Sequence, residues 1–419
     1  MVQEKEFGME VRKKRVLSLF SGAGGMDLGL EGDFLAPGKS VDGSSEGWIR
    51  VPATSFTTVF ANDILKDART AWTGFFSKRG HSPEVYHLES IVELVRRHEA
   101  GESVFPSDID VVTGGFPCQD FSVAGKRLGF DSNKNDLGKR RDDEGEFSET
   151  SRGKLYYWMK RVIDIVKPKI FIAENVKGLV SLGDALDIIR KDFAGDGGYF
   201  VLEPQILKAW EYGVPETRER VIFIGIRRDA MKDGVEESLN KETIIYKETG
   251  DSSKLKCFPY PVKTHGDSKF PLVVCRDVLG HLREPSEETD DLAQKAYSTA
   301  RFLGKGKQGQ TEIKWNGLAP TIRSEHHGNI EYRRLCTVNG GKMTEELEQG
   351  KPERRLTVRE CALIQTFPPD YEFIIKRDGV KLTQSGAYKV IGNAVPPVLA
   401  YKIARRLEDV WENLFGKEK

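Results

Sequence analysis

The chain has 419 residues, of which 31% are charged and 38% are hydrophobic, a composition typical of a globular protein. Its 64 lysines and arginines balance 64 aspartates and glutamates, so net charge alone does not predict a nucleic-acid partner. A polyanion would have to bind a face on which positive charge is segregated. The length suits two domains, or one large domain with an insertion.

The five cysteines are widely spaced, odd in number and form no C-x-x-C pair. We therefore expect no disulfide framework and no metal site, and we place the protein in a reducing cytoplasm. Residues 1–15 are charged and lack the apolar core of a signal peptide. No apolar run approaches the roughly 20 residues that span a membrane, so no membrane association is predicted.

The first predicted unit is a strand at residues 16–20, a glycine-rich turn at 21–25 and the start of a helix. This order is typical of nucleotide-binding α/β folds. Asp27, however, stands where the dinucleotide-binding pattern has its third glycine. A nicotinamide enzyme is therefore disfavoured, and a cofactor with a nucleoside but no pyrophosphate remains open.

Residues 32–57 are rich in turn formers and predict an inserted loop or hairpin. A second strand at 57–61 then ends in Asn62 and Asp63. An acidic residue at this position can bind ribose hydroxyls. It can equally cap a helix that starts near Ile64, and the two roles are compatible.

A third strand at 109–113 leads into Gly114-Gly115-Phe116-Pro117-Cys118. A cysteine displayed at the carboxyl end of a strand is a candidate nucleophile, and a buried structural thiol is the alternative. Residues 131–148 predict either a lid or a surface insertion, and 152–167 have helical periodicity.

Further strands at 169–173 and 221–226 adjoin Glu174-Asn175-Val176 and Arg218-Glu219-Arg220. The alternation of strands and helices predicts a mostly parallel sheet with helices on both faces. Residues 229–350 do not show this alternation of strands and helices. Eight Lys or Arg against three Asp or Glu between 295 and 334 predict a nucleic-acid face or a merely solvated surface. Helices are expected again at 356–367 and 398–414.

Six blocks together resemble the cytosine-C5 DNA methyltransferase family, of the bacterial and archaeal modification type, in the order that this family uses. In chain order they are Leu19–Gly25, Gly114–Ser122, Glu174–Val176, Arg218–Arg220, Arg355–Glu360 and Gly392–Pro397. The resemblance implies a Rossmann-like α/β methyltransferase domain at 1–228, completed by 351–419. It also implies a smaller, irregular target-recognition domain at 229–350.

The activity implied is methyl transfer to C5 of cytosine. The resemblance makes Cys118 the nucleophile that adds to C6 and Glu174 the acid that supports N3. Arg220 and Arg218 would hold the base carbonyl or an adjacent phosphate and could favour the thiolate electrostatically. The chemistry agrees, because thiolate addition makes the poorly nucleophilic C5 reactive.

The implied methyl donor is S-adenosylmethionine. The resemblance assigns its contacts to Phe20, Ser21, Gly22, Ala23, Gly24, Gly25, Asp63, Ile64, Ser90, Ile91, Pro117, Leu155, Asn393 and Ala394. Two positions depart from the family pattern. Glu89-Ser90-Ile91 lacks the usual Asp-Ile pair, and Glu216 stands where Gln is usual.

The implied substrate is double-stranded DNA with the target cytosine flipped out of the helix. Residues 126–150 would close over the base, and 229–350 would contact the major groove. We expect a monomer that works beside a restriction endonuclease. The alternatives are a tRNA cytosine-5 methyltransferase and a DNA-binding relative without activity.

Overall fold

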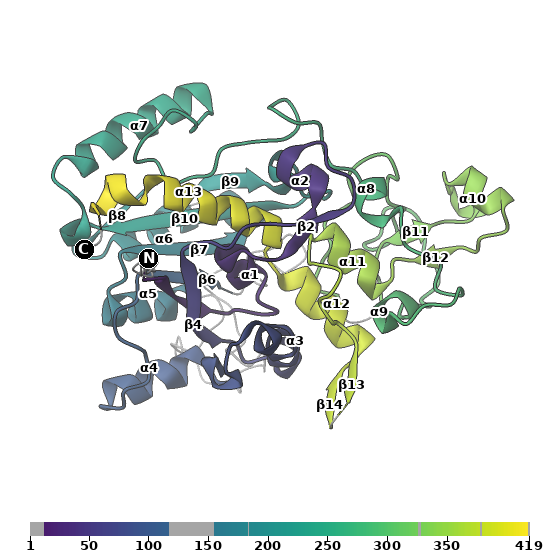
Figure 1. The fold of residues 1–419 in the computed structure, drawn as a ribbon, viewed down its shortest axis with the longest axis horizontal. Helices are drawn as coiled ribbons and strands as arrows, with labels where there is room; N and C mark the ends of the chain where they lie inside the picture. Colours follow the sequence, from purple (N-terminus) through teal and green to yellow (C-terminus); the bar gives the residue numbers. More distant parts are fainter. Residues whose placement is uncertain (1–11, 117–154, 183, 326–327, 378, 418–419) are drawn as a thin grey trace, which may run out of the picture.

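A computed structural model describes residues 12–116, 155–182, 184–325, 328–377 and 379–417 (Figure 1). Pro117, Cys118 and the 126–150 segment lie outside the described residues. No helix among the described residues is long and apolar enough to cross a membrane.

The core element is an eight-stranded sheet in the order β5-β4-β1-β6-β7-β10-β8, with β9 paired to β10. Five neighbouring strands are parallel, and β10 runs antiparallel to β7, β8 and β9. The strands are β1 (Lys14–Leu19), β4 (Phe56–Asn62), β5 (Tyr86–His87), β6 (Val111–Gly115), β7 (Ile170–Val176), β8 (Tyr199–Val201), β9 (Gln205–Lys208) and β10 (Glu219–Arg227). The predicted, mostly parallel sheet is confirmed.

Helices cover both faces of this sheet because successive strand residues point to opposite sides. Val16 and Val111 pack with one layer, which contains α1 (Gly25–Glu31), α3 (Lys66–Phe76) and α13 (Pro397–Phe415). Leu17 and Val112 pack with the other, which contains α4 (Ile91–Glu99), α5 (Leu155–Val166) and α6 (Ala185–Ala194). The helices predicted at 152–167 and 398–414 are thus confirmed as α5 and α13.

An N-terminal and a C-terminal helix lie in contact, because α1 packs against α13. A Cβ added at Gly29 would lie 2.3 Å from the Cβ of Ala400, and one at Gly25 would lie 2.2 Å from the carbonyl oxygen of Val395. Only glycine permits such close helix contact, because real Cβ atoms do not approach this near. The C-terminal segment therefore forms part of the layer that carries the glycine-rich turn.

The 32–57 insertion is a hairpin of β2 (Leu35–Pro37) and β3 (Trp48–Arg50), with α2 (Gly38–Asp42) between the strands. The hairpin alternative from the sequence is therefore confirmed. Its helix is tied to the region before β10, because the Ser40 hydroxyl donates to the Gly213 carbonyl at 2.6 Å.

Residues 229–350 contain α7 (Val235–Thr249), α8 (Cys275–Leu279), α9 (Leu292–Lys295), β11 (Tyr332–Arg334) and α10 (Thr344–Glu348). They are followed by β12 (Arg354–Arg355), α11 (Val358–Ile364), β13 (Ile375–Arg377), β14 (Val380–Leu382) and α12 (Gln384–Asn393). Figure 1 shows α7 and α10 at opposite ends of the molecule. Leu239, Tyr260 and Ile322 are buried in the same apolar cluster as the sheet, so the hydrophobic core is continuous between these regions.

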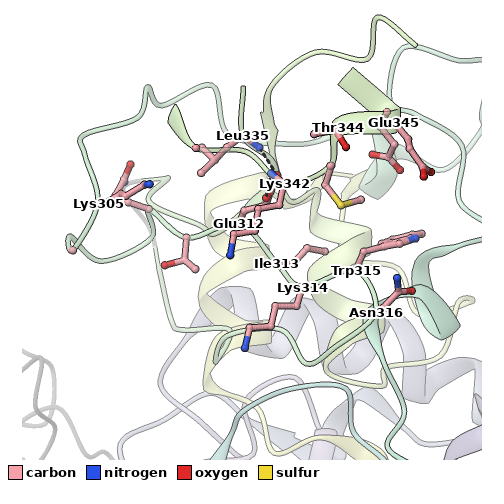
Figure 2. A pocket seen from close by; sticks show the side chains of 16 residues that line it. Lys305, Glu312, Ile313, Lys314, Trp315, Asn316, Leu335, Lys342, Thr344 and Glu345 are labelled. Atoms are coloured by element: carbon pink, nitrogen blue, oxygen red, sulfur yellow. Dashed lines mark hydrogen bonds between the residues drawn. The ribbon is translucent and has the colours of Figure 1, made fainter. Parts of the chain in front are cut away.

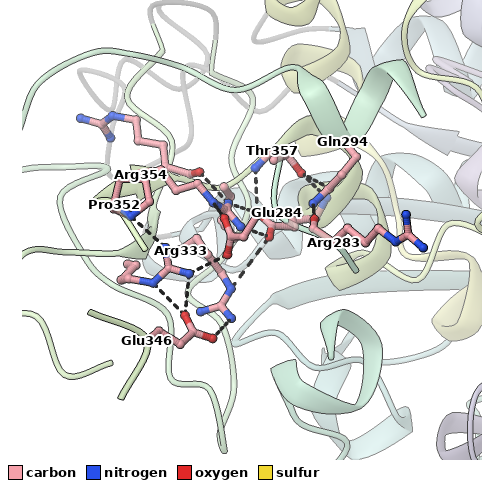
Figure 3. Close-up of polar contacts among 12 residues, drawn as sticks. Arg283, Glu284, Gln294, Arg333, Glu346, Pro352, Arg354 and Thr357 are labelled. Carbon is pink, nitrogen blue, oxygen red and sulfur yellow. Dashed lines mark hydrogen bonds and ion pairs between the residues drawn. The ribbon is translucent and has the colours of Figure 1, made fainter. Parts of the chain in front are cut away.

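An ionic cluster joins β11 and β12 to α11 (Figure 3). Arg334 pairs with Glu284 and Glu346, each at 2.6 Å, and Arg354 binds Glu360 through two bonds of 2.8 and 2.9 Å. Burial would raise the pKa of Glu284, but Arg354 and Arg334 hold it at about 2. This carboxylate therefore stays ionised at neutral pH and keeps its two arginine partners.

Candidate active site

The carboxyl ends of β4, β1, β6 and β7 lie at one edge of the sheet, because these four neighbouring strands are parallel. Such an edge is where ligands bind in open α/β folds. The glycine-rich turn follows β1, Asp63 follows β4, and Glu174 lies near the end of β7. Glu174 is the register partner of Gly115, the last residue of β6. Cys118 comes three residues later in the chain.

The turn after β1 is held by hydrogen bonds to β4. Phe20 adopts a left-handed backbone conformation with φ 53°, which reverses the chain direction directly after the strand. The Ser21 hydroxyl donates to the Ser18 carbonyl at 2.9 Å and accepts from the Asn62 amide at 3.0 Å. These bonds fix the turn against the neighbouring strand.

Asp63 bridges the turn and the start of the following segment. Its carboxyl group accepts from the Gly22 amide at 3.1 Å and from the Leu65 amide at 2.9 Å. Burial raises the pKa of Asp63, and these two amides oppose the rise. The Tyr86 hydroxyl donates to the Gly22 carbonyl at 3.1 Å. The sequence does not predict this role of Tyr86, because no sequence feature near residue 86 shows that β5 lies beside the glycine-rich turn.

The turn fits a nucleoside better than a pyrophosphate. Gly22 has φ +56°, and a Cβ there would meet no atom within 4 Å, so the backbone is open to close approach by a ligand. The half-buried Phe20 offers an aromatic surface and the half-buried Asp63 offers a carboxylate for hydroxyl groups. This donor set matches the adenosine part of S-adenosylmethionine.

Asp27 explains why the dinucleotide pattern is broken. Its fully buried carboxylate accepts from the Ser18 hydroxyl at 2.5 Å and from the Trp72 indole at 2.7 Å. Burial raises its pKa to about 6, and these two bonds oppose the rise. A buried acid directly beneath the turn is unfavourable for a pyrophosphate.

Three other predicted cofactor contacts lie at the start of α4 and in the apolar layer beside Phe20. Ser90 caps α4 by accepting from the Val92 amide at 3.2 Å, and Ile91 and Leu155 are buried in the apolar layer against which Phe20 packs. Asn62 donates to the carbonyls of His87 and Glu89, which holds this segment next to β4. The Glu89 carboxylate pairs with Arg97 at 2.6 Å.

The predicted contacts near the C-terminus lie at the end of α12. Asn393 is exposed there, and Ala394 is buried. A Cβ at Gly25 would come 3.3 Å from the Cβ of Ala394. The structure therefore brings the C-terminal block against the glycine-rich turn, as the resemblance implied. Ile64 is half-buried beside Asp63.

Glu174 and Arg220 form a close ion pair at the sheet edge, with Nε and Oε1 2.7 Å apart. The pair arises because β7 and β10 are antiparallel neighbours, with Glu174 opposite Ile222. A Cβ at Gly115 would lie 2.8 Å from Oε2 of Glu174, so the glycine leaves room for the acid. The buried Asn175 donates to the Phe116 carbonyl at 3.3 Å, which ties β7 to the segment that leads to Cys118.

Arg218 lies apart from this pair and is almost fully buried, with 1% of its surface exposed. Its guanidinium donates to the carbonyls of Ile322 at 3.0 Å, Gly392 at 3.0 Å and Ala394 at 2.7 Å. These contacts join the segment before β10 to the 229–350 region and to the end of α12. They account for the burial of Arg218 without a ligand.

Glu216 is fully buried beside Arg218. Its Oε1 accepts from the Ile322 amide at 2.5 Å and lies 3.7 Å from the Arg218 guanidinium, while Oε2 has no hydrogen-bond partner among the described residues. Burial raises the pKa of Glu216 to about 7, and Arg218 opposes the rise. The protonated acid resembles the glutamine that the family pattern has here.

A model of the C-5 cytosine-specific DNA methylase family matches residues 14–141 and 142–409. The chain belongs to this family. The methyltransferase is 32% identical to the Type II methyltransferase M.BspRI of Lysinibacillus sphaericus, over 97% of this chain and 84% of that protein. It is also 32% identical to M.PspPI of Psychrobacter sp. (strain TA137), over 94% and 79%. It uses S-adenosylmethionine to methylate C5 of cytosine in DNA.

Solved structures show the same fold for the methyltransferase. The Dnmt2 methyltransferase of S. pombe superimposes with a TM-score of 0.53 at 17% identity, over 94% of this chain and 99% of that one. The EhMeth methyltransferase of Entamoeba histolytica gives 0.53 at 14% identity, over 96% and 98%. The tRNA alternative gains no support, because the matching family model is one of DNA methylases.

Gly115→Ala tests the space reserved for Glu174. The added methyl group would displace the carboxylate, and misplacing a catalytic group by about 1 Å can cost about 100-fold in rate. We expect methyl transfer to fall by about 10- to 100-fold, while S-adenosylmethionine affinity stays near that of the wild type. Gly198→Ala is the control, because a Cβ there meets no atom within 4 Å. Full turnover by Gly115→Ala would contradict this role.

Glu216→Gln tests the buried acid. Because the pKa of Glu216 is raised in the folded state, its contribution to stability is fully present below pH about 4.5 and is lost as the pH rises through about 7. Glutamine cannot ionise, so the free energy of unfolding at pH 8.5 should rise by about 1–3 kcal/mol relative to the wild type.

The measurement is urea unfolding at several values between pH 5 and 8.5. Glu248→Gln is the matched control, because this glutamate is exposed on α7. If the free energy of unfolding of the wild type and of Glu216→Gln depends on pH in the same way, the pKa of Glu216 is not raised in the folded state.

Proposed function

We propose that the methyltransferase acts through a covalent adduct between the sulfur of Cys118 and C6 of a flipped cytosine. The observation that carries this proposal is the Glu174–Arg220 pair beside Gly115, three residues before Cys118 in the chain. An acid and a cation lie at this edge of the sheet, and we assign the thiol to the same edge from the position of Cys118 in the sequence. This is the set that activates a pyrimidine for attack.

The Cys118 thiolate would form a bond to C6, which makes C5 nucleophilic. Glu174 would bring a proton to N3, so that negative charge does not build up in the ring. Arg220 orients Glu174 and supplies positive charge for the base carbonyl. After C5 has gained the methyl group and lost its proton to a base, the bond from sulfur to C6 breaks and the thiolate is regenerated.

S-adenosylmethionine supplies an electrophilic methyl group when bound. We propose that Phe20 contacts its adenine, that the backbone of residues 21–25 follows its ribose and methionine portions, and that Asp63 accepts from the ribose hydroxyls. The support is the open backbone at Gly22 and the two partly exposed side chains beside it. Asn393 would complete the site from the opposite end of the chain.

Arg218 acts, in this proposal, as a positioning residue and does not touch the base. Its three carbonyl partners belong to the 229–350 region and to α12. Substrate recognition by residues 229–350 would thus be linked to the strand that carries Arg220. The sequence-based role of Arg218 at the base or a phosphate is replaced by this one, because its guanidinium is occupied by backbone oxygens.

The biological setting proposed is a restriction-modification system. The relatives M.BspRI and M.PspPI are both named Type II methyltransferases and align over nearly all of this chain. By analogy, the enzyme would act as a monomer on double-stranded DNA and protect the sites that a partner endonuclease cuts.

The direct test is expression with a plasmid, followed by bisulfite sequencing of that plasmid. We expect 5-methylcytosine at one position of a short recurring sequence, which would also identify the target. Cys118→Ser is the matched variant, because the hydroxyl is a much weaker nucleophile at neutral pH. It should abolish methylation while S-adenosylmethionine affinity stays near normal. Retained turnover by Cys118→Ser would remove this residue from the mechanism.

A further inference from the structure

A cavity of about 710 Å³ lies in the 229–350 region, between the segments 305–316 and 335–346 (Figure 2). This volume falls in the range of about 300–1,000 Å³ typical of ligand sites. The proposed mechanism assigns no role to this cavity.

Three lysines on its walls are available to a ligand. Lys305, Lys314 and Lys342 are exposed, and none forms an ion pair with another described residue. The acid between them is occupied by the backbone. Glu312 accepts from the Leu335 amide at 2.9 Å and from the Lys342 amide at 2.7 Å. The three lysines therefore outnumber this acid, whose oxygens are already occupied by backbone amides.

Arginines neutralise a second acid of the wall. Glu346 accepts from Arg333 at 2.8 Å and from Arg334 at 2.7 Å. The Arg333 guanidinium also stacks over the Trp315 ring, 4.0 Å from its centroid. Glu345 is exposed at the rim, where solvent screens its charge. With three lysines against Glu312 and Glu345, the two wall acids that have no arginine partner among the described residues, the cavity carries a net positive charge, which favours an anion.

A glycine-rich loop borders the same cavity, with the sequence Gly304-Lys305-Gly306-Lys307-Gln308-Gly309. Gly304 has φ +99° and Gly306 has φ +83°, and a Cβ at either position would meet no atom within 4 Å. Backbone of this kind can approach a phosphate closely and offer amide donors to it.

One buried side chain binds the last residue of the loop and a residue a short distance before its start. Arg355, 1% exposed, donates to the carbonyl of Ala300 at 2.7 Å and to that of Gly309 at 2.6 Å. Because Ala300 and Gly309 are fixed, the loop loses less conformational entropy when it binds a ligand.

We propose that this cavity and the 304–309 loop bind a phosphodiester group of the DNA backbone. The inference rests on the proposed function of residues 229–350 in DNA binding. A backbone phosphate fits because lysines are flexible point charges, and such contacts fix the position of the duplex without reading its bases.

The cavity wall continues directly into the junction near the active site. The Trp315 carbonyl accepts from the Arg276 amide at 2.9 Å, and Ala319 exchanges backbone bonds of 2.9 and 2.8 Å with Pro215 and Thr217. A phosphate held at the cavity is therefore linked, over a few residues, to the segment that holds Glu216 and Arg218. Binding here would set the register of the DNA relative to the sheet edge.

The test is the triple variant Lys305→Ala, Lys314→Ala, Lys342→Ala, with a fluorescent random-sequence duplex of about 30 base pairs as the probe. Each lost phosphate contact should lower the slope of log affinity against log salt by about 0.9. Because the cavity is proposed to bind one phosphodiester group, we expect a slope reduced by about 1 and affinity weakened about tenfold at 100 mM salt. S-adenosylmethionine affinity should not change.

The control is Lys241→Ala, Lys247→Ala, Lys254→Ala, which removes the same charge from exposed positions on or just after α7. Its salt slope should stay within about 0.5 of the wild type. If the cavity variant keeps the wild-type slope and affinity, the inference is overturned. If it changes the choice of target sequence without a uniform loss of affinity, the cavity reads bases and not phosphates. Plasmid methylation by the wild type is measured separately, so loss of the proposed function would be recognised on its own.

Discussion

The buried guanidinium of Arg218 is the interaction on which the arrangement of the active site depends. Three carbonyl oxygens from residues 322, 392 and 394 converge on it, and Glu216 lies beside it. A buried cation is costly unless it is fully hydrogen-bonded, so this site is stable only when all the partner segments are in place. Two residues later, at the start of β10, Arg220 holds Glu174. The acid is therefore positioned by the same short segment, residues 218–220, that fastens the 229–350 region to the sheet.

The C-terminal segment contacts both the first helix and Arg218. Gly25 and Gly29 allow residues 394–400 to pack directly on the first helix, next to the turn that we assign to the cofactor. The carbonyl of Ala394 is also bound by Arg218. Contacts between residues far apart in the chain thus connect the glycine-rich turn, Glu174 and the 229–350 region. A shift of one of these parts would move the others directly, because they are packed together and not joined by a flexible linker.

Much of this fold could be predicted from the sequence, because the buried strands are short apolar runs that end in glycine or polar residues. The strands at 16–20, 57–61, 109–113, 169–173 and 221–226 all appear, as does the hairpin at 32–57. The Glu174–Arg220 pair could not be predicted, because it depends on β10 running antiparallel to β7. The partners of Arg218 could not be predicted, because they depend on contacts across 104 to 176 residues of chain. Likewise, no nearby sequence feature identifies Tyr86 as a hydrogen-bond donor to the glycine-rich turn. Nor does one place Leu239 and Tyr260 in the hydrophobic core beside the sheet.

If Arg218 holds distant segments together and does not contact the substrate, weakening its hydrogen bonds should loosen those segments. Hydrogen exchange of Arg218→Lys, compared with the wild type, tests this most directly, because lysine keeps the charge but cannot reach three carbonyls at once. We expect faster amide exchange in residues 319–323 and in residues 392–395 together, with exchange in residues 170–176 unchanged. Wild-type exchange in both segments, with methyl transfer lost, would contradict this expectation and return Arg218 to the base or the DNA.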